Sequence, residues 1–148
     1  MYTHLKFKNK KACVLGMGKS GISCARLLKR QGVKVLLSEE NVLPVATGLE
    51  GIEVEVGGHS QAVYESDFVV KSPGISHSHP VIKKLKKLGK PVFSEVEIAM
   101  AYTPKDCQVF AITGTNGKTT TTMMLSEIMK AHAKEEGLGR KVYTVGNI

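Results

Sequence analysis

An α/β fold with a parallel, doubly wound sheet is predicted by three features of this 148-residue sequence. Short apolar runs alternate with segments of helical spacing through the first two thirds of the chain, which is the pattern of strand–helix–strand units. A glycine-rich turn at residues 16–21 follows the first apolar run and opens the first helical segment. A second turn, at residues 114–118, stands in the same position between an apolar run and a helical segment.

The first unit begins with a strand, a turn, a helix and a second strand. Residues 11–15 (KACVL) form the first apolar run. Ile22, Ala25 and Leu28 then recur at helical spacing, and Gly32 marks the expected end of that helix. The second strand is predicted over residues 33–37 (VKVLL). Because right-handed crossovers bring the carboxyl ends of parallel strands to one edge of the sheet, we expect ligands to bind there.

The same alternation continues to residue 93. A turn-rich connection precedes residues 52–56, where apolar and acidic side chains alternate, and this pattern predicts a strand near an edge of the sheet. Further strands are predicted over residues 68–70 and 91–93, and a helix over residues 80–88.

We place the first domain at residues 1–102, a linker at 103–107 and a second domain at 108–148. The second domain is predicted to contain a strand, a helix and a strand, at residues 109–113, 119–133 and 141–145. Two parallel strands with one helix leave one sheet face and both edges bare. We therefore expect this segment to be loosely held, whereas residues 1–100 fold independently.

The formal net charge of +8 is distributed in blocks along the chain. Residues 1–34 carry nine Lys and Arg and no acid, whereas residues 35–70 carry seven acids and no base. The densest basic run, at residues 83–87, alternates with apolar residues and indicates the solvated face of an amphipathic helix. With 5% aromatic residues and no Trp, the composition also argues against a protein that stacks nucleic-acid bases. We expect no nucleic-acid partner.

The three cysteines form no CxxC pair, and the N-terminus lacks the apolar stretch of a signal peptide. No apolar run approaches the length that spans a membrane. These features predict a cytoplasmic protein without membrane contact, which we expect to be a monomer.

The turn Gly16-x-Gly18-x-x-Gly21 is typical of a phosphate-binding site. Gly16 permits the tight turn, Gly18 lets a phosphate approach the backbone, and Gly21 lets helix and strand pack closely. The helix N-terminus adds oriented N–H groups, and Lys19 and Ser20 supply further donors. Glu39 lies at the end of the second strand. Taken alone, these residues are also those of an NAD-binding domain.

A second phosphate-binding loop is predicted at residues 113–120, with the sequence TGTNGKTT. Its backbone N–H groups would cradle phosphates, Lys118 would reach the outer ones, and the Thr119 hydroxyl would bind Mg²⁺. Ile112 stands where the general P-loop pattern has its first glycine.

A third turn, Ser72-Pro73-Gly74, follows the strand at residues 68–70 and is expected at the same sheet edge. Turn chemistry explains this segment as well as ligand contact does. His77 and His79 follow, but no Cys or carboxylate cluster joins them, so the sequence predicts surface histidines and no zinc site.

Together these motifs resemble the Mur ligases, ATP-dependent enzymes that form amide bonds in the peptidoglycan precursor. The resemblance runs along the whole chain. The order of the motifs is similar to that in the members that add D-glutamate. It rests on six motifs: GMGKSG at 16–21, GGH at 57–59, SPGI at 72–75, SEVEI at 94–98, TGTNGKTTT at 113–121 and GNI at 146–148.

The resemblance implies a Rossmann-like first domain that binds the UDP of a sugar-nucleotide substrate, followed by the start of a P-loop ATPase domain. Ser38 and Glu39 would lie near the uridine, although Glu39-Glu40 replaces a pair that is often polar and basic in the family. The implied substrate-binding residues are Gly18, Lys19, Ser20, Ser38, Glu39, Ser72, Pro73, Gly74 and Asn147. The implied ATP-binding residues are Gly114, Thr115, Asn116, Gly117, Lys118, Thr119 and Thr120, with Thr119 also on Mg²⁺.

The resemblance also implies the reaction. ATP would phosphorylate the carboxylate of UDP-N-acetylmuramoyl-L-alanine, and the amine of D-glutamate would displace phosphate from the acyl phosphate. Lys118 would be the catalytic residue, because it and Mg²⁺ would neutralise charge on the transferring phosphoryl group. Family members have three domains and this chain ends within the expected second. We therefore expect an N-terminal piece that is inactive alone.

Two other hypotheses stay open at the level of sequence. An NAD-dependent dehydrogenase domain would explain the first glycine-rich turn and Glu39, although the loop at residues 114–120 argues against it. A basic nucleic-acid-binding module would explain the net charge, and its mark would be an affinity for DNA that falls steeply with salt.

Overall fold

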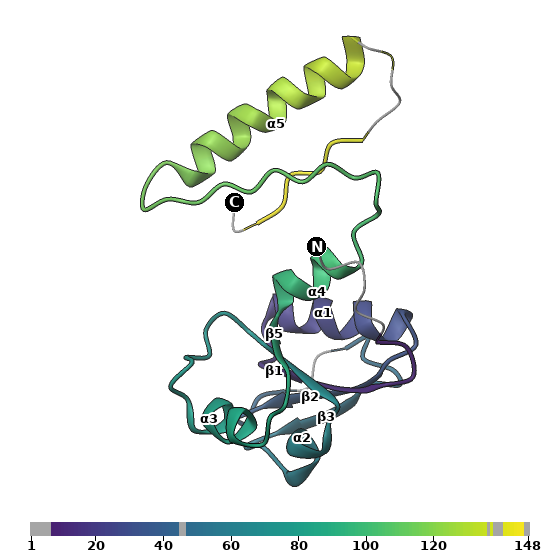
Figure 1. The fold of residues 1–148 in the computed structure, drawn as a ribbon, viewed down its shortest axis with the longest axis vertical. Helices are drawn as coiled ribbons and strands as arrows, with labels where there is room; N and C mark the ends of the chain where they lie inside the picture. Colours follow the sequence, from purple (N-terminus) through teal and green to yellow (C-terminus); the bar gives the residue numbers. More distant parts are fainter. Residues whose placement is uncertain (1–6, 45–46, 136, 138–140, 147–148) are drawn as a thin grey trace. The chain divides into compact units, whose positions relative to one another are not determined.

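The computed structural model describes residues 7–44, 47–135, 137 and 141–146. The chain divides into two compact units, Met1–Lys105 and Asp106–Ile148. The first unit holds a parallel sheet with its helices, and the second holds one long helix, α5 (Lys118–Glu135) (Figure 1).

The sheet of the first unit has five strands in the order β3-β2-β1-β4-β5, all parallel. The predicted α/β fold is therefore confirmed, and β3 lies at an edge as expected. The strands are β1 (Lys11–Leu15), β2 (Lys34–Glu39), β3 (Glu53–Val56), β4 (Phe68–Lys71) and β5 (Val92–Ser94). After β1, the chain adds β2 and β3 on one side of that strand and then β4 and β5 on the other side. The order therefore reverses between β1 and β4, which is the point where ligands bind in open parallel sheets.

The helices cover both faces of the sheet. They are α1 (Lys19–Arg30), α2 (Gln61–Glu65), α3 (Pro80–Lys87) and α4 (Glu95–Ala101). Helices α1 and α4 contribute to one cluster of buried side chains, and α2 and α3 contribute to the other. Because β1 is buried on both faces, its side chains alternate between the clusters: Ala12 and Val14 join the first, Cys13 and Leu15 the second.

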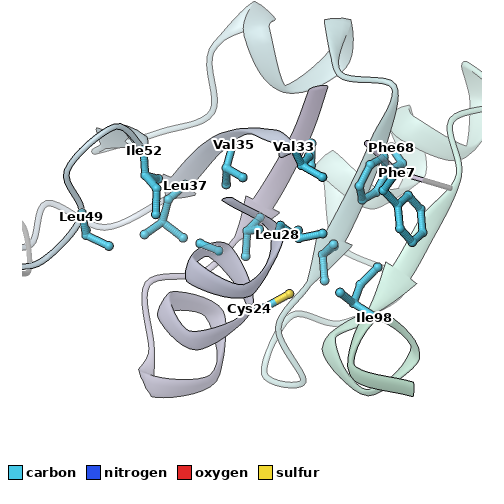
Figure 2. Close-up of a cluster of buried hydrophobic side chains, with 14 of the residues drawn as sticks. Phe7, Cys24, Leu28, Val33, Val35, Leu37, Leu49, Ile52, Phe68 and Ile98 are labelled. Atoms are coloured by element: carbon cyan, nitrogen blue, oxygen red, sulfur yellow. The ribbon is translucent and has the colours of Figure 1, made fainter. Parts of the chain in front are cut away.

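The larger cluster fixes α1 and α4 on the same face of the sheet (Figure 2). Cys24 and Leu28 of α1 and Ile98 of α4 are buried there, together with Val35 and Leu37 of β2. Of the residues predicted at helical spacing, Ala25 and Leu28 are buried in this cluster and Ile22 packs against it partly buried. This packing orients the amino end of α1 at the carboxyl edge of the sheet.

Two short helices, α2 and α4, were not predicted from the sequence. Helix α2 has only five residues, too few for a helical period to emerge. Helix α4 begins with a capping box, in which the Ser94 side chain accepts a hydrogen bond from the Glu97 N–H and the Glu97 carboxylate accepts one from the Ser94 N–H.

In the second unit, the strands predicted over residues 109–113 and 141–145 are absent, and both segments are irregular. A strand needs a hydrogen-bonded neighbouring strand, and neither segment is paired in a sheet among the described residues. Val109, Phe110, Tyr143 and Val145 are each at least 50% exposed. Helix α5 forms close to its predicted bounds, and Ser126 is its one buried residue among those described. No helix of the described residues has the length and apolar character needed to cross a bilayer.

Candidate functional site

The three glycines of the turn between β1 and α1 have different surroundings. Gly16 has a φ of +97°, and a Cβ there would lie 2.7 Å from Ser72 Oγ. A Cβ on Gly21 would lie 2.1 Å from the Gly16 carbonyl oxygen. Gly18 has an ordinary φ of −72° and no atom within 4 Å of its absent Cβ. Gly16 and Gly21 are therefore required for packing, whereas Gly18 leaves open space above the backbone.

The amino end of α1 is uncapped. Its N-cap residue, Gly18, offers no side chain, and the first turn contains no acidic residue. Gly18, Lys19 and Ser20 are all exposed. The first N–H groups of a helix and its partial positive charge attract anions. This end of α1 is therefore suited to an anionic group.

Glu39 lies at the end of β2 and is hydrogen-bonded to the same turn. Its carboxylate accepts hydrogen bonds from the Met17 N–H (2.9 Å), the Asn41 N–H (3.0 Å) and the Asn41 side chain (2.9 Å). Burial acts to raise the pKa of Glu39, but these hydrogen bonds and the nearby His59 lower it below its ordinary value. Glu39 is an ionised acceptor already engaged by the protein's own backbone.

Ser38 is fully buried beside Glu39 and joins two side chains of the neighbouring connection. Its Oγ donates to Glu55 Oε1 (2.6 Å) and lies 2.7 Å from His59 Nδ1. Burial acts to raise the pKa of Glu55, but hydrogen bonds from Ser38 and Ser60 and the charge of His59 lower it overall. The predicted role of Ser38 as a substrate contact stays a prediction, and its hydroxyl is engaged within the protein.

Two histidines lie at this edge that sequence reasoning gave no role. His59 and His79 have ring centroids 6.3 Å apart, and His79 Nε2 is 3.1 Å from Glu40 Oε2. His79 Nδ1 accepts a long hydrogen bond from the Val81 N–H (3.4 Å) at the start of α3. Among the described residues there is no group of three His, Cys, Asp or Glu side chains that could hold a metal ion.

The Ser72-Pro73-Gly74 turn lies across the switch point from α1. The Ser72 N–H donates to the Leu15 carbonyl (3.0 Å), and its Oγ donates to Glu95 Oε1 (2.8 Å). Pro73 and Gly74 are exposed. Ser72 therefore faces into the protein, whereas its two neighbours face solvent.

Glu95, Glu55 and His59 were not singled out as functional from the sequence. Each contacts a partner that is 17 to 23 positions away in the sequence. No short sequence pattern predicts contacts between residues so far apart in the chain. The nearest signal was the Ser-x-x-Glu spacing at residues 94–97, which marks a helix start and would have placed Glu95 in a first turn.

In the second unit, the loop before α5 has the backbone of a glycine-dependent turn. Gly114 and Gly117 have φ values of +154° and +75°. Lys118 Nζ donates to the carbonyls of Gly114 (2.6 Å) and Thr115 (3.2 Å), while Thr119 and Thr120 are exposed. The other predicted substrate contact, Asn147, lies outside the described residues.

Comparison with known families identifies the first unit. Residues 10–94 match the family model described as the Mur ligase MurD-like N-terminal domain. The chain belongs to the MurD-like Mur ligases. The resemblance drawn from the motifs is thereby confirmed at the level of the family.

Two curated relatives of this Mur ligase chain have the same name. The UDP-N-acetylmuramoylalanine–D-glutamate ligase of Elusimicrobium minutum is 53% identical over all of this chain, which covers 33% of that protein. The ligase of the same name from Chloroherpeton thalassium is 41% identical over 99% of the chain, covering 32% of that protein. The chain thus spans about a third of the length of these relatives.

A solved structure extends the likeness to another Mur ligase. The UDP-N-acetylmuramate–alanine ligase of Thermotoga maritima matches 85% of this chain with a TM-score of 0.54 and 27% sequence identity. The match covers 30% of that chain.

Proposed function

We propose that this chain is the nucleotide-sugar-binding part of an ATP-dependent ligase that joins D-glutamate to UDP-N-acetylmuramoyl-L-alanine. The reaction and its substrates come from the names of the relatives. The observation in the structure that carries the binding role is the uncapped amino end of α1 at the switch point of the sheet.

The diphosphate of the substrate is the group best suited to this end of α1. Gly18 leaves space for it, and the first-turn N–H groups, the Lys19 ammonium and the Ser20 hydroxyl offer donors. Hydrogen bonds between charged groups are about twice as strong as neutral ones. Pro73 and Gly74, which are exposed across the switch point, would line the other side of the ligand.

The engagement of Glu39 argues against the contact between acid and ribose that an NAD-binding fold makes at this position. In NAD-binding folds, an acid at this position accepts hydrogen bonds from the ribose hydroxyls. Here Glu39 accepts three hydrogen bonds from the two turns beside it, including one from the Met17 N–H in the turn between β1 and α1. A ribose would have to compete with those bonds.

ATP and Mg²⁺ would be held by the loop before α5. Its residues fit a phosphate group, because Gly114 and Gly117 hold backbone conformations that other residues rarely adopt and Lys118 already lies over the loop carbonyls. The Lys118 ammonium would bind the outer phosphates, and the exposed Thr119 hydroxyl would bind the metal ion. Mg²⁺ would supply positive charge to the phosphate oxygens.

Titration with UDP-N-acetylmuramoyl-L-alanine, followed by amide NMR, tests the proposal. We expect the signals of residues 16–21 to move, and Lys19→Ala to weaken binding roughly tenfold by removing a charged donor. Lys34→Ala is the matched control, because it removes the same charge at the other end of the sheet and should change affinity less than about twofold.

Two results would count against the proposal. The first is the absence of any signal change at residues 16–21 with millimolar ligand. The second is tighter binding of NADH than of UDP at the same residues, which would favour a nicotinamide-binding domain.

A further inference from the structure

We infer that Glu95 is a positioning residue of the phosphate-binding edge: its buried carboxylate holds the Ser72 hydroxyl against the Gly16–Gly21 turn. The inference deepens the proposed function, because the ligand that benefits is the diphosphate at the amino end of α1. The positioning itself is a property of the protein without ligand.

The Ser72 side chain packs against the Gly16–Gly21 turn. Its Oγ is 2.7 Å from the place where a Cβ on Gly16 would stand, and 3.2 Å from that on Gly21. Its backbone N–H is fixed to the Leu15 carbonyl (3.0 Å). The Ser72 side chain therefore packs directly on the two glycines that shape the turn, and its rotamer sets how closely they approach β4.

The proton of the Ser72 hydroxyl is committed to Glu95. A serine hydroxyl has one hydrogen, and that of Ser72 is donated to Glu95 Oε1 at 2.8 Å. The hydroxyl cannot donate to a phosphate at the same time. Ser72 therefore serves the site by shaping it, and the anion contacts fall to Gly18, Lys19 and Ser20.

Glu95 occupies a place where a carboxylate is costly. It is 9% exposed, and Ser72 is the one described side chain that donates a hydrogen bond to it. Among the described residues it forms no ion pair. Removing a carboxylate from water without a charged partner is unfavourable, although the amino end of α4 offsets part of that cost.

The start of α4 does not need Glu95 for its own stability. Ser94 and Glu97 supply the reciprocal hydrogen bonds of the capping box. Ile98, three residues after Glu95 and on the same side of the helix, is buried in the cluster that packs α4 against α1 (Figure 2). The position of α4 therefore does not depend on Glu95, and the helix holds the Glu95 carboxylate in place.

The experiment compares Glu95→Ala, Glu95→Gln and Ser72→Ala in UDP titrations of the full chain followed by NMR. Glu95→Ala should weaken UDP binding roughly tenfold, because the Ser72 hydroxyl would no longer be held against the turn and UDP binding would have to order that turn. Glu95→Gln should stay within about threefold of the wild type, because its amide oxygen still accepts the Ser72 proton. The double variant Ser72→Ala/Glu95→Ala should bind no more weakly than the weaker single variant.

Glu97→Ala is the matched control. It removes a carboxylate from the same turn of α4 and breaks the cap, but it does not contact Ser72. UDP affinity should therefore stay close to that of the wild type in the folded Glu97→Ala protein. An equal loss in Glu97→Ala and Glu95→Ala would overturn the inference, and so would additive losses in the double variant.

Amide exchange of the free protein gives a second measurement that does not depend on UDP. We expect faster exchange at Gly16, Met17 and Ser72 in Glu95→Ala and Ser72→Ala, with wild-type rates in Glu95→Gln. If wild-type protein fails to bind UDP, the proposed function fails while this measurement still decides the positioning role. Unchanged exchange in all three variants would refute it. If Glu95→Ala does not fold, Glu95→Gln and Ser72→Ala provide the same comparison.

Discussion

At the scale of single residues, the glycines of the Gly16–Gly21 turn have two different roles. Gly16 and Gly21 are glycines because a side chain would collide with Ser72 or with the Gly16 carbonyl. Gly18 has room for a side chain and a φ that any residue adopts. The absence of a side chain at Gly18 leaves the backbone N–H groups at the start of α1 accessible. The same motif therefore contains two positions that folding requires and one position that we propose for binding.

Alanine substitutions should separate these uses. Gly21→Ala should lower the free energy of unfolding by roughly 1–3 kcal/mol, because its Cβ would meet a backbone oxygen that cannot move aside cheaply. Gly18→Ala should change stability by less than about 0.5 kcal/mol and weaken UDP binding instead. Urea unfolding combined with UDP titration measures both effects. Equal destabilisation by the two substitutions would show that the space above Gly18 is needed for folding.

At the scale of elements, the sequence predicted the strands that are buried on both faces. Such strands appear as continuous apolar runs, and β1, β2 and β4 lie close to their expected bounds. Helix α4 was missed because Ser94 ends a strand and begins a helix without an intervening loop. The runs at residues 109–113 and 141–145 have the composition of strands but no sheet to join among the described residues. A strand is a property of its neighbours as much as of its own residues.

Amide hydrogen exchange should distinguish these two kinds of apolar run. Amides of residues 109–113 and 141–145 should exchange orders of magnitude faster than those of β1 under the same conditions, because they lack ladder hydrogen bonds. Helix α5, with most of its length exposed, should show intermediate protection. Protection of residues 109–113 equal to that of β1 would show that these residues are paired in a sheet in solution.

At the scale of the whole molecule, the candidate site was only partly open to prediction. Gly18, Lys19 and Ser20 are close in sequence, so a motif can reveal them. The contacts that support them join distant parts of the chain: Ser72 with Glu95, and Ser38 with Glu55 and His59. These contacts exist only because the order of the strands brings their carboxyl ends together. The order of the strands cannot be predicted from any short stretch of the sequence.

Stability of the first unit should depend on pH through Glu39 and Glu55. Both have pKa values in the folded protein below the ordinary 4.5. Their contribution to stability is therefore complete above about pH 4.5 and is lost as the pH falls through the lower folded values. Urea unfolding of the wild type and Glu55→Gln should differ at pH 7, and the difference should shrink as the pH is lowered towards 3.

Glu53→Gln provides the comparison for this effect, because Glu53 lies on the same strand with an exposed side chain. Its replacement should alter stability little at either pH. A difference between the wild type and Glu55→Gln that grows on acidification would contradict the hydrogen-bonding pattern around Ser38.

The buried hydroxyl of Ser38 also determines where a proton resides on its neighbour. Ser38 Oγ lies 2.6 Å from Glu55 Oε1 and 2.7 Å from His59 Nδ1. An ionised carboxylate can only accept, so the single hydroxyl hydrogen points to Glu55, and the second contact requires a hydrogen on His59 Nδ1. Whether the His59 ring is charged or neutral, this arrangement requires the hydrogen on Nδ1, so the neutral form would be the Nδ1–H tautomer.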